Sequence, residues 1–186
     1  MAGYFERFHR GSLRLQGYDY ARAGAYFVTI VAHQRRMFFG KIIGGEMNLS
    51  NVGEIAARCW NGIPDHFPSV VLDEFVVMPD HMHGIIVIKR DLEWAAAAQH
   101  AEQLLRHPFH PPQRPRRNAY QHIIPKSLGS IIRQFKGAVT RECGIRGIAF
   151  RWQRNFHERI IRDDRHLTNV RRYIRNNPMR WSEENE

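Results

Sequence analysis

The strongest constraint on the fold is a pair of apolar runs separated by only two residues, Pro79-Asp80. The runs are Val70 to Met78 and His81 to Ile88, and both contain many β-branched side chains, which favour strands. Because Pro and Asp are typical turn residues, the runs are expected to form adjacent antiparallel strands joined by a tight turn. The chain is therefore predicted to fold around an antiparallel sheet with this pair in its core.

The other periodic segments predict helices that pack on that sheet. Apolar residues at helical spacing, preceded by Ser, Asn or Asp, indicate three helices. They are expected from Ser50 or Asn51 to about Trp60, from Ser127 to about Cys143, and from Asp163 or Asp164 to a stop at Pro178. Further strands are expected at Tyr26–Val31, Met37–Ile43, Glu46–Leu49 and Ile148–Trp152. This order predicts an α+β fold close to the ferredoxin-like arrangement.

Length and composition fit one domain. The chain has 186 residues, of which 43% are hydrophobic, and this is enough for a full core. The proline-rich, basic stretch at residues 90–125 is expected to be a flexible insertion within a single domain spanning residues 1–186. No run has the roughly 20 apolar residues of a membrane helix, and no signal-peptide pattern is present. With two isolated cysteines, Cys59 and Cys143, this predicts a cytoplasmic protein.

Positive charge is concentrated in the last third of the chain. The whole chain carries a formal charge of +10, and residues 126–180 alone hold 14 basic and 4 acidic residues. A basic segment of this kind suggests a phosphate backbone as the partner. A solvated surface on a basic protein is the alternative explanation.

His81 and His83 form the sharpest local feature. Side chains alternate along a strand, so the two imidazoles lie on one face with their Cα atoms about 7 Å apart, while Met82 points to the other face. Two imidazoles in this arrangement can converge on one metal ion. Two inert, hydrogen-bonded histidines at a strand end are the alternative.

Tyr173 and Asn177 form the second feature. On a helix they are separated by one turn, so they lie on the same shoulder of the apolar stripe formed by Leu167, Val170 and Ile174. A side chain on such a shoulder can be half buried and still reach a cleft. The alternative is that Tyr173 packs at an interface and Asn177 caps the helix.

Together the two features suggest a phosphodiester reaction. A tyrosine can attack a phosphodiester and form a covalent phosphotyrosine. A divalent ion held by His81, His83 and the amide oxygen of Asn177 would polarise the phosphate beside the nucleophile, Tyr173. Mixed nitrogen and oxygen ligands suit Mg²⁺ or Mn²⁺, although Zn²⁺ or Ni²⁺ could bind such a site as well.

The sequence resembles the single-tyrosine HUH transposases of bacterial insertion sequences, and in particular the REP-associated tyrosine transposases. The HxH pair and the Tyr-x-x-x-Asn-Pro motif occur in the order typical of that family, within matching blocks along nearly the whole chain. The blocks are Arg14 to Tyr20, Gly24 to Ile30, Phe75 to Gly84, Ser127 to Lys136, Trp152 to Phe156, Glu158 to Arg162 and Tyr173 to Pro178.

The resemblance implies a ferredoxin-like or RRM-like HUH endonuclease fold and metal-dependent cleavage and rejoining of single-stranded DNA. It assigns His81, His83 and Asn177 as metal ligands, and Tyr173 as the nucleophile that becomes joined to the 5′-phosphate. The implied partners are single-stranded or hairpin DNA, such as a palindromic repeat or insertion-sequence ends, so the protein would be nucleoid-associated when bound. DNA transposition and palindrome processing both stay open, as do the monomer and the homodimer. Asp80 stands where the family often has Asn, and it is not expected to touch the ligands.

Several basic and aromatic residues are candidates for DNA contact. Arginine and lysine would neutralise phosphates, and tryptophan can stack on unpaired bases. Core packing is the alternative for the tryptophan, and surface charge is the alternative for the basic residues. The candidates are Arg14, Lys126, Arg133, Lys136, Arg151, Trp152, Arg154, Arg171, Arg172 and Arg175.

Two other functions remain open from the sequence. One is a non-catalytic module of the same fold that binds hairpin DNA or RNA. The other is a metal-dependent hydrolase that uses a metal-bound water, in which Tyr173 would be dispensable and no covalent intermediate would form. Replacing Tyr173 with phenylalanine separates these functions from the phosphotyrosine mechanism.

Overall fold

The computed structural model describes residues 21–89 and 125–185. Its centre is a four-stranded antiparallel sheet with the strand order β4-β5-β1-β6. The strands are β1 (Gly24–Val31), β4 (Val70–Val77), β5 (His81–Ile88) and β6 (His157–Ile161). The two apolar runs are β4 and β5, as predicted, and they pair directly with each other.

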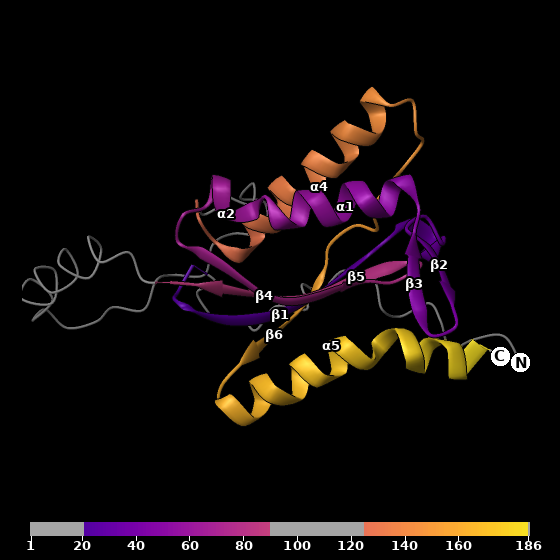
Figure 1. Ribbon diagram of the computed structural model, residues 1–186. Helices are drawn as coiled ribbons and strands as arrows, with labels where there is room; N and C mark the ends of the chain where they lie inside the picture. Colours follow the sequence, from indigo (N-terminus) through magenta and orange to yellow (C-terminus); the bar gives the residue numbers. More distant parts are fainter. Residues whose placement is uncertain (1–20, 90–124, 186) are drawn as a thin grey trace, which may run out of the picture.

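Helices cover both faces of the sheet (Figure 1). One face carries α1 (Asn51–Asn61), the short α2 (Ile63–His66) and α4 (Leu128–Ile145), and the other carries α5 (Asp164–Asn185). A separate hairpin of β2 (Gly40–Ile43) and β3 (Glu46–Leu49), preceded by the 3-10 turn η1 (His33–Arg35), lies beside the C-terminal half of α5. Without the hairpin and the short elements η1 and α2, the order is strand, helix, two strands, helix, strand, followed by the additional helix α5. This order confirms the predicted α+β, ferredoxin-like class.

The helix starts follow from the predicted capping residues. The Ser50 hydroxyl accepts a hydrogen bond from the Gly53 amide at the start of α1, and Ser127 does the same for Ser130 at the start of α4. The Asp163 side chain accepts from the His166 amide immediately before α5. These side chains satisfy amides that have no partner within the first helical turn.

Alternation along the strands divides the apolar residues between two cores. Met82 and Ile86 of β5 point toward α1 and α4, in the larger core. Ile85, which directly precedes Ile86, points to the opposite face of the sheet and packs with Val170 and Ile174 of α5. Both faces of β5 are therefore buried, which explains its almost continuous apolar sequence.

Gly84 of β5 allows the large ring of Trp60 to lie directly on the strand. A Cβ atom at position 84 would lie 2.3 Å from Cζ2 of Trp60. The Trp60 ring is fully buried and packs against Phe75 and edge-on against Phe135. Glycine is thus required here by close packing rather than by its backbone angles.

Two sequence-based boundaries were wrong. Ile148–Trp152 is not a strand, because it is irregular apart from one isolated bridge between Trp152 and Ala32. The strand that completes the sheet is β6, which has only two apolar residues because it lies at the sheet edge. The last helix does not stop at Pro178 but continues to Asn185. Packing beyond the proline accounts for this, since the Trp181 ring lies 5.8 Å from the His81 ring.

Most of the predicted insertion at 90–125, and Arg14, lie outside the described residues. Within the part of the chain that the structure describes, no helix combines the length and apolar character needed to cross a bilayer.

Candidate active site

The two histidines of β5 lie together on the sheet face that α5 covers. Strand alternation places His81 and His83 on this face and buries Met82 in the opposite core. Both imidazoles are largely buried, and their Nε2 atoms are 3.0 Å apart. The convergence predicted from the HxH spacing is therefore present in the structure.

Asp80 orients His81. The carboxylate Oδ1 is 2.5 Å from Nδ1 of His81, and Oδ2 accepts from Arg35 at 3.2 Å. Burial alone would raise the pKa of Asp80, but the hydrogen bond from His81 and the charges of His81 and Arg35 outweigh it, so the pKa is lowered. Because an ionised carboxylate only accepts, Nδ1 of His81 carries the hydrogen of this bond, and Nε2 is directed toward His83. The expectation that Asp80 would not touch the ligands was wrong.

Thr29 of β1 contacts the second histidine. Its hydroxyl lies 2.8 Å from Nδ1 of His83, because the two residues are directly paired between β1 and β5. A hydroxyl can accept or donate, so it accommodates either neutral form of the imidazole. Burial, and then the charge of His81, lower the pKa of His83 to about 3. His83 is therefore neutral at physiological pH, as a metal ligand must be.

Tyr173 reaches the histidine pair from α5. Its hydroxyl oxygen is 3.3 Å from Nε2 of His83, and its side of the helix remains open to solvent, with 39% of the residue exposed. Phe27 of β1 lies edge-on to the Tyr173 ring and stacks on the His83 ring. The predicted nucleophile and the two predicted histidine ligands thus form one cluster.

Asn177, the third predicted ligand, is buried one helical turn after Tyr173. Among the described residues, no group of three or more His, Cys, Asp or Glu side chains is placed to hold a metal. The predicted set has two imidazoles and an amide oxygen instead, a mixed nitrogen and oxygen donor set that can hold a divalent metal ion.

The histidine pair fits a metal ion. Two nitrogens about 2.1 Å from one ion, at right angles about its centre, would lie about 3.0 Å apart. This is the separation between the Nε2 atoms of His81 and His83. The carboxylate on Nδ1 of His81 is also the kind of outer contact that metal-binding histidines usually have.

The described candidates for DNA contact outside α5 belong to α4 and the segments next to it. The Lys136 ammonium donates to the carbonyls of Gln153 and Asn155, and burial lowers its pKa to about 8. Trp152 donates to the Lys136 carbonyl and packs in the main core, so both residues connect α4 to the following loop. Four others are exposed: Lys126, Arg133, Arg151 and Arg154. Their role in DNA binding stays a prediction.

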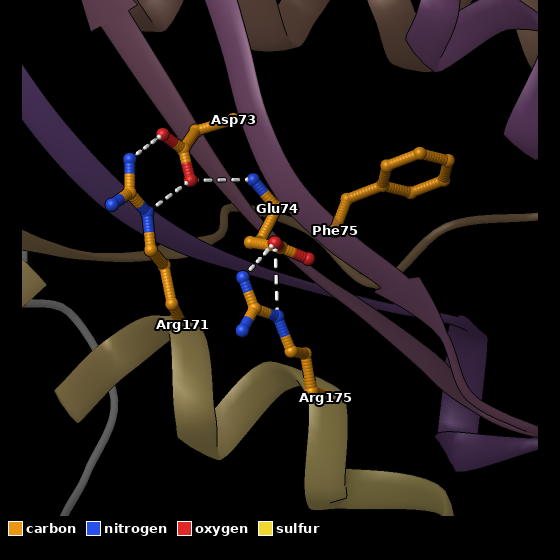
Figure 2. Close-up of a pocket in the computed structure, with 5 residues that line it drawn as sticks. All are labelled: Asp73, Glu74, Phe75, Arg171 and Arg175. Carbon is orange, nitrogen blue, oxygen red and sulfur yellow. Dashed lines mark hydrogen bonds and ion pairs between the residues drawn. The ribbon is translucent and has the colours of Figure 1, made fainter. Parts of the chain in front are cut away.

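The arginines of α5 mostly contact other side chains. Arg171 pairs with Asp73, and Arg175 pairs with Glu74, both on β4 (Figure 2). Arg172, which is exposed, donates to Asn169 one turn earlier. The two pairs on β4 join the helix that carries Tyr173 to the edge of the sheet.

Sequence comparison places the chain in a family. It is 38% identical over 177 residues to an uncharacterized protein of Haemophilus influenzae, across 95% of this chain and 92% of that protein. The chain belongs to the same family as that protein. No family model matches the chain.

Comparison with solved structures identifies a protein whose fold is similar to that of this chain. A REP-associated tyrosine transposase solved in complex with a REP hairpin aligns with a TM-score of 0.56 and 19% identity, over 92% of this chain and 74% of that one. A transposase-like protein of Deinococcus radiodurans aligns with 13% identity over 89% of this chain and 97% of that one, at a TM-score of only 0.39. The first alignment shows that the chain has the fold of a tyrosine transposase.

Sequence reasoning missed the residues that support the site in this family member. Asp80 directly precedes His81, so a carboxylate next to a candidate ligand was an available signal. Thr29 and Phe27 lie more than 50 residues away, and only the register between β1 and β5 brings them to His83. Arg35 gives no sequence signal, because it reaches the site through Asp80.

The buried, neutral His83 makes a prediction about pH. Its pKa is about 3 in the folded protein and about 6.5 in an unfolded chain, so between these values only the unfolded chain takes up the proton. Above about pH 6.5 both states leave this histidine neutral, so it does not lower the free energy of unfolding. As the pH falls from 6.5 toward 3, proton uptake by the unfolded chain progressively lowers the free energy of unfolding. Urea unfolding in a chelating buffer between pH 7 and 5 should show a steeper loss for the wild type than for His83→Gln. Equal slopes would contradict a neutral buried His83.

Proposed function

We propose that the protein is a transposase-type enzyme that cleaves and rejoins single-stranded DNA with the help of Mg²⁺ or Mn²⁺. The observation that carries this proposal is the cluster of Tyr173, His83 and His81, with a hydroxyl 3.3 Å from one imidazole nitrogen and the second imidazole 3.0 Å further on. A nucleophile beside two imidazole nitrogens at this spacing matches a metal-assisted attack on a phosphodiester.

Tyr173 would carry the covalent step. Its phenolic oxygen attacks the scissile phosphorus, the bond from phosphorus to the 3′ oxygen breaks, and the DNA 5′-phosphate becomes joined to the tyrosine. The tyrosine loses its proton, and the departing 3′ oxygen takes one up to become a hydroxyl. Rejoining is the reverse attack by a 3′-hydroxyl, so the phosphodiester energy is kept and no external energy source is needed.

The surrounding residues would orient these groups. A divalent ion, bound by His81, His83 and Asn177, would polarise the phosphate and stabilise its developing charge. Asp80 and Arg35 keep the hydrogen of His81 on Nδ1, so that Nε2 faces the site. Phe27 supports both the Tyr173 ring and the His83 ring, which limits their movement.

A DNA substrate is supported by charge and by the related fold. The chain carries a formal charge of +10, and Arg133, Arg151 and Arg154 are exposed. The similar structure is of a protein bound to a REP hairpin. We infer that single-stranded or hairpin DNA is also the partner here, with backbone phosphates providing most of the affinity.

A covalent-trapping assay tests the proposed function. Labelled single-stranded hairpin DNA is mixed with the protein and Mg²⁺ or Mn²⁺ and run on a denaturing gel. We expect a slowly migrating adduct that disappears in Tyr173→Phe and in the presence of a chelator. Tyr26→Phe, which removes a hydroxyl in the opposite core, is the matched control and should keep the adduct.

The other outcomes select the alternatives. Metal-dependent cleavage that survives in Tyr173→Phe would identify a hydrolase that uses a metal-bound water. Tight binding across a pool of hairpins, with neither cleavage nor adduct in the wild type, would identify a binding module.

A further inference from the structure

An irregularity in β4 directs two consecutive acidic side chains toward α5. Leu72 pairs with Ile86 and Phe75 pairs with Gly84, so two residues of β4 lie opposite one residue of β5. In a regular strand, neighbouring side chains point to opposite faces. At this bulge the carboxylates of Asp73 and Glu74 both reach α5, whereas Phe75 points away from the arginines (Figure 2).

Each carboxylate binds one arginine of α5 through two nitrogens. Asp73 accepts from Nε of Arg171 at 2.8 Å and from Nη2 through its other oxygen, and it also accepts from the Glu74 amide. Glu74 accepts from Nε and Nη2 of Arg175 through one oxygen. The hydrogen bond from Arg171 holds the pKa of Asp73 below its ordinary value, which keeps the carboxylate charged. Paired contacts of this kind fix direction as well as distance.

The two arginines project from one side of the buried stripe of α5, and Tyr173 projects from the other side. At about 100° per residue, Arg171 and Arg175 are about 40° apart, and Tyr173 is about 160° from both. The buried residues Val170 and Ile174 face the sheet between these two sides. Rotation of α5 about its axis therefore moves the tyrosine and the arginines together.

Small rotations matter for the reaction. An atom about 9 Å from the helix axis moves about 1.5 Å when the helix turns by about 10°. The apolar contacts of Val170 and Ile174 are non-directional and resist such rotation weakly. A misplacement of about 1 Å at a reacting group can reduce a rate by about 100-fold.

We propose that the Asp73–Arg171 and Glu74–Arg175 pairs form a positioning clamp for Tyr173. The clamp sets the rotation of α5 so that the tyrosine hydroxyl faces His83. The two arginines are then held by protein carboxylates rather than by DNA phosphates. This inference rests on the proposed function, and it opposes the DNA-contact role that the sequence predicted for the same arginines.

A double-mutant cycle distinguishes the two roles. The variants are Asp73→Asn, Arg171→Gln and the combination of both, with Arg165→Gln as a control that removes an exposed arginine of the same helix. Exposed ion pairs contribute only about 0–1 kcal/mol, so all variants should fold. We expect each single change to slow adduct formation at saturating DNA by about 2- to 5-fold, the range that an ion pair of this strength allows, and the double change to be no slower than the slower single.

DNA affinity gives the opposing result if the clamp is wrong. For the clamp, the dissociation constant and its salt dependence should stay within about twofold in all variants. For a phosphate contact, Arg171→Gln should reduce the salt slope by about 0.7, and Asp73→Asn should tighten binding by releasing the arginine. That second pattern would overturn the proposal.

A spectroscopic measurement tests the clamp even without catalysis. The protein is labelled with 3-fluorotyrosine, and the ¹⁹F resonance of Tyr173 is assigned by its loss in Tyr173→Phe. We expect this resonance to move in Asp73→Asn, Arg171→Gln, Glu74→Gln and Arg175→Gln, and to stay in place in Arg165→Gln. Failure of wild-type adduct formation would overturn the proposed function alone, whereas an unmoved resonance in all four variants would overturn the clamp alone.

Discussion

His81→Ala is expected to abolish metal-dependent strand cleavage while leaving most of the affinity for single-stranded DNA. The histidine would supply one of the two proposed imidazole ligands, and its Nε2 lies 3.0 Å from that of His83. A bound divalent ion contributes several kcal/mol to such a reaction, so we expect cleavage to fall by at least about 10³-fold. DNA affinity should change by less than about threefold, because backbone contacts dominate it.

Two measurements check this expectation. Calorimetric titration with Mn²⁺ should show loss of the binding site, and the trapping assay should show loss of the adduct. His66→Ala is the matched control, because His66 is an exposed histidine of α2, on the sheet face opposite α5. Parallel loss of cleavage and of DNA affinity in His81→Ala would instead mean that the histidines contact DNA or support the fold.

Gly84→Ala should destabilise the protein more than its size suggests. The added methyl group would lie 2.3 Å from Cζ2 and 2.8 Å from Cη2 of Trp60, whose ring is fully buried. Phe75 and Phe135 restrict movement of that ring. Overpacking of this kind costs about 1–3 kcal/mol, which corresponds to a decrease of about 3–10 °C in Tm for a chain of this length.

The same substitution at Gly137 is the control for Gly84→Ala. Gly137 lies inside α4, and a Cβ there would meet nothing within 4 Å. Gly137→Ala should therefore raise stability by about 0.5–1 kcal/mol through helix propensity. Thermal melting compares the two variants, and Trp60→Phe should partly restore Gly84→Ala. A stabilised Gly84→Ala would contradict the packing of Trp60 on β5.

The spacing of apolar residues predicted most of the fold, because apolar side chains occupy the positions that are buried. The strand β5 and the helices α1 and α4 have many buried residues, so their apolar patterns are strong. The edge strand β6 has the sequence His-Glu-Arg-Ile-Ile, in which only Ile161 is buried. The end of α5 depends on a contact between Trp181 and His81, two residues that are 100 positions apart.

The candidate site was predictable only where its residues lie close in sequence. The pair His81 and His83 and the pair Tyr173 and Asn177 are visible as spacings within one strand and one helix. That Tyr173 meets His83 required the packing of α5 on the sheet. Charge alone also could not distinguish an arginine that faces solvent from Arg171, which is paired with Asp73.

Because side chains alternate along β5, the candidate site can form only when β5 pairs in the correct register. A shift of one residue between β5 and β1 would turn His81 and His83 into the main core and turn Met82 out toward α5. The same shift would place His83 or Ile85, depending on its direction, rather than Gly84 against the Trp60 ring, where there is no room for a side chain. A misaligned chain would thus lack both a stable core and the proposed metal site. Under the proposed function, a chain in this shifted register could not cleave DNA.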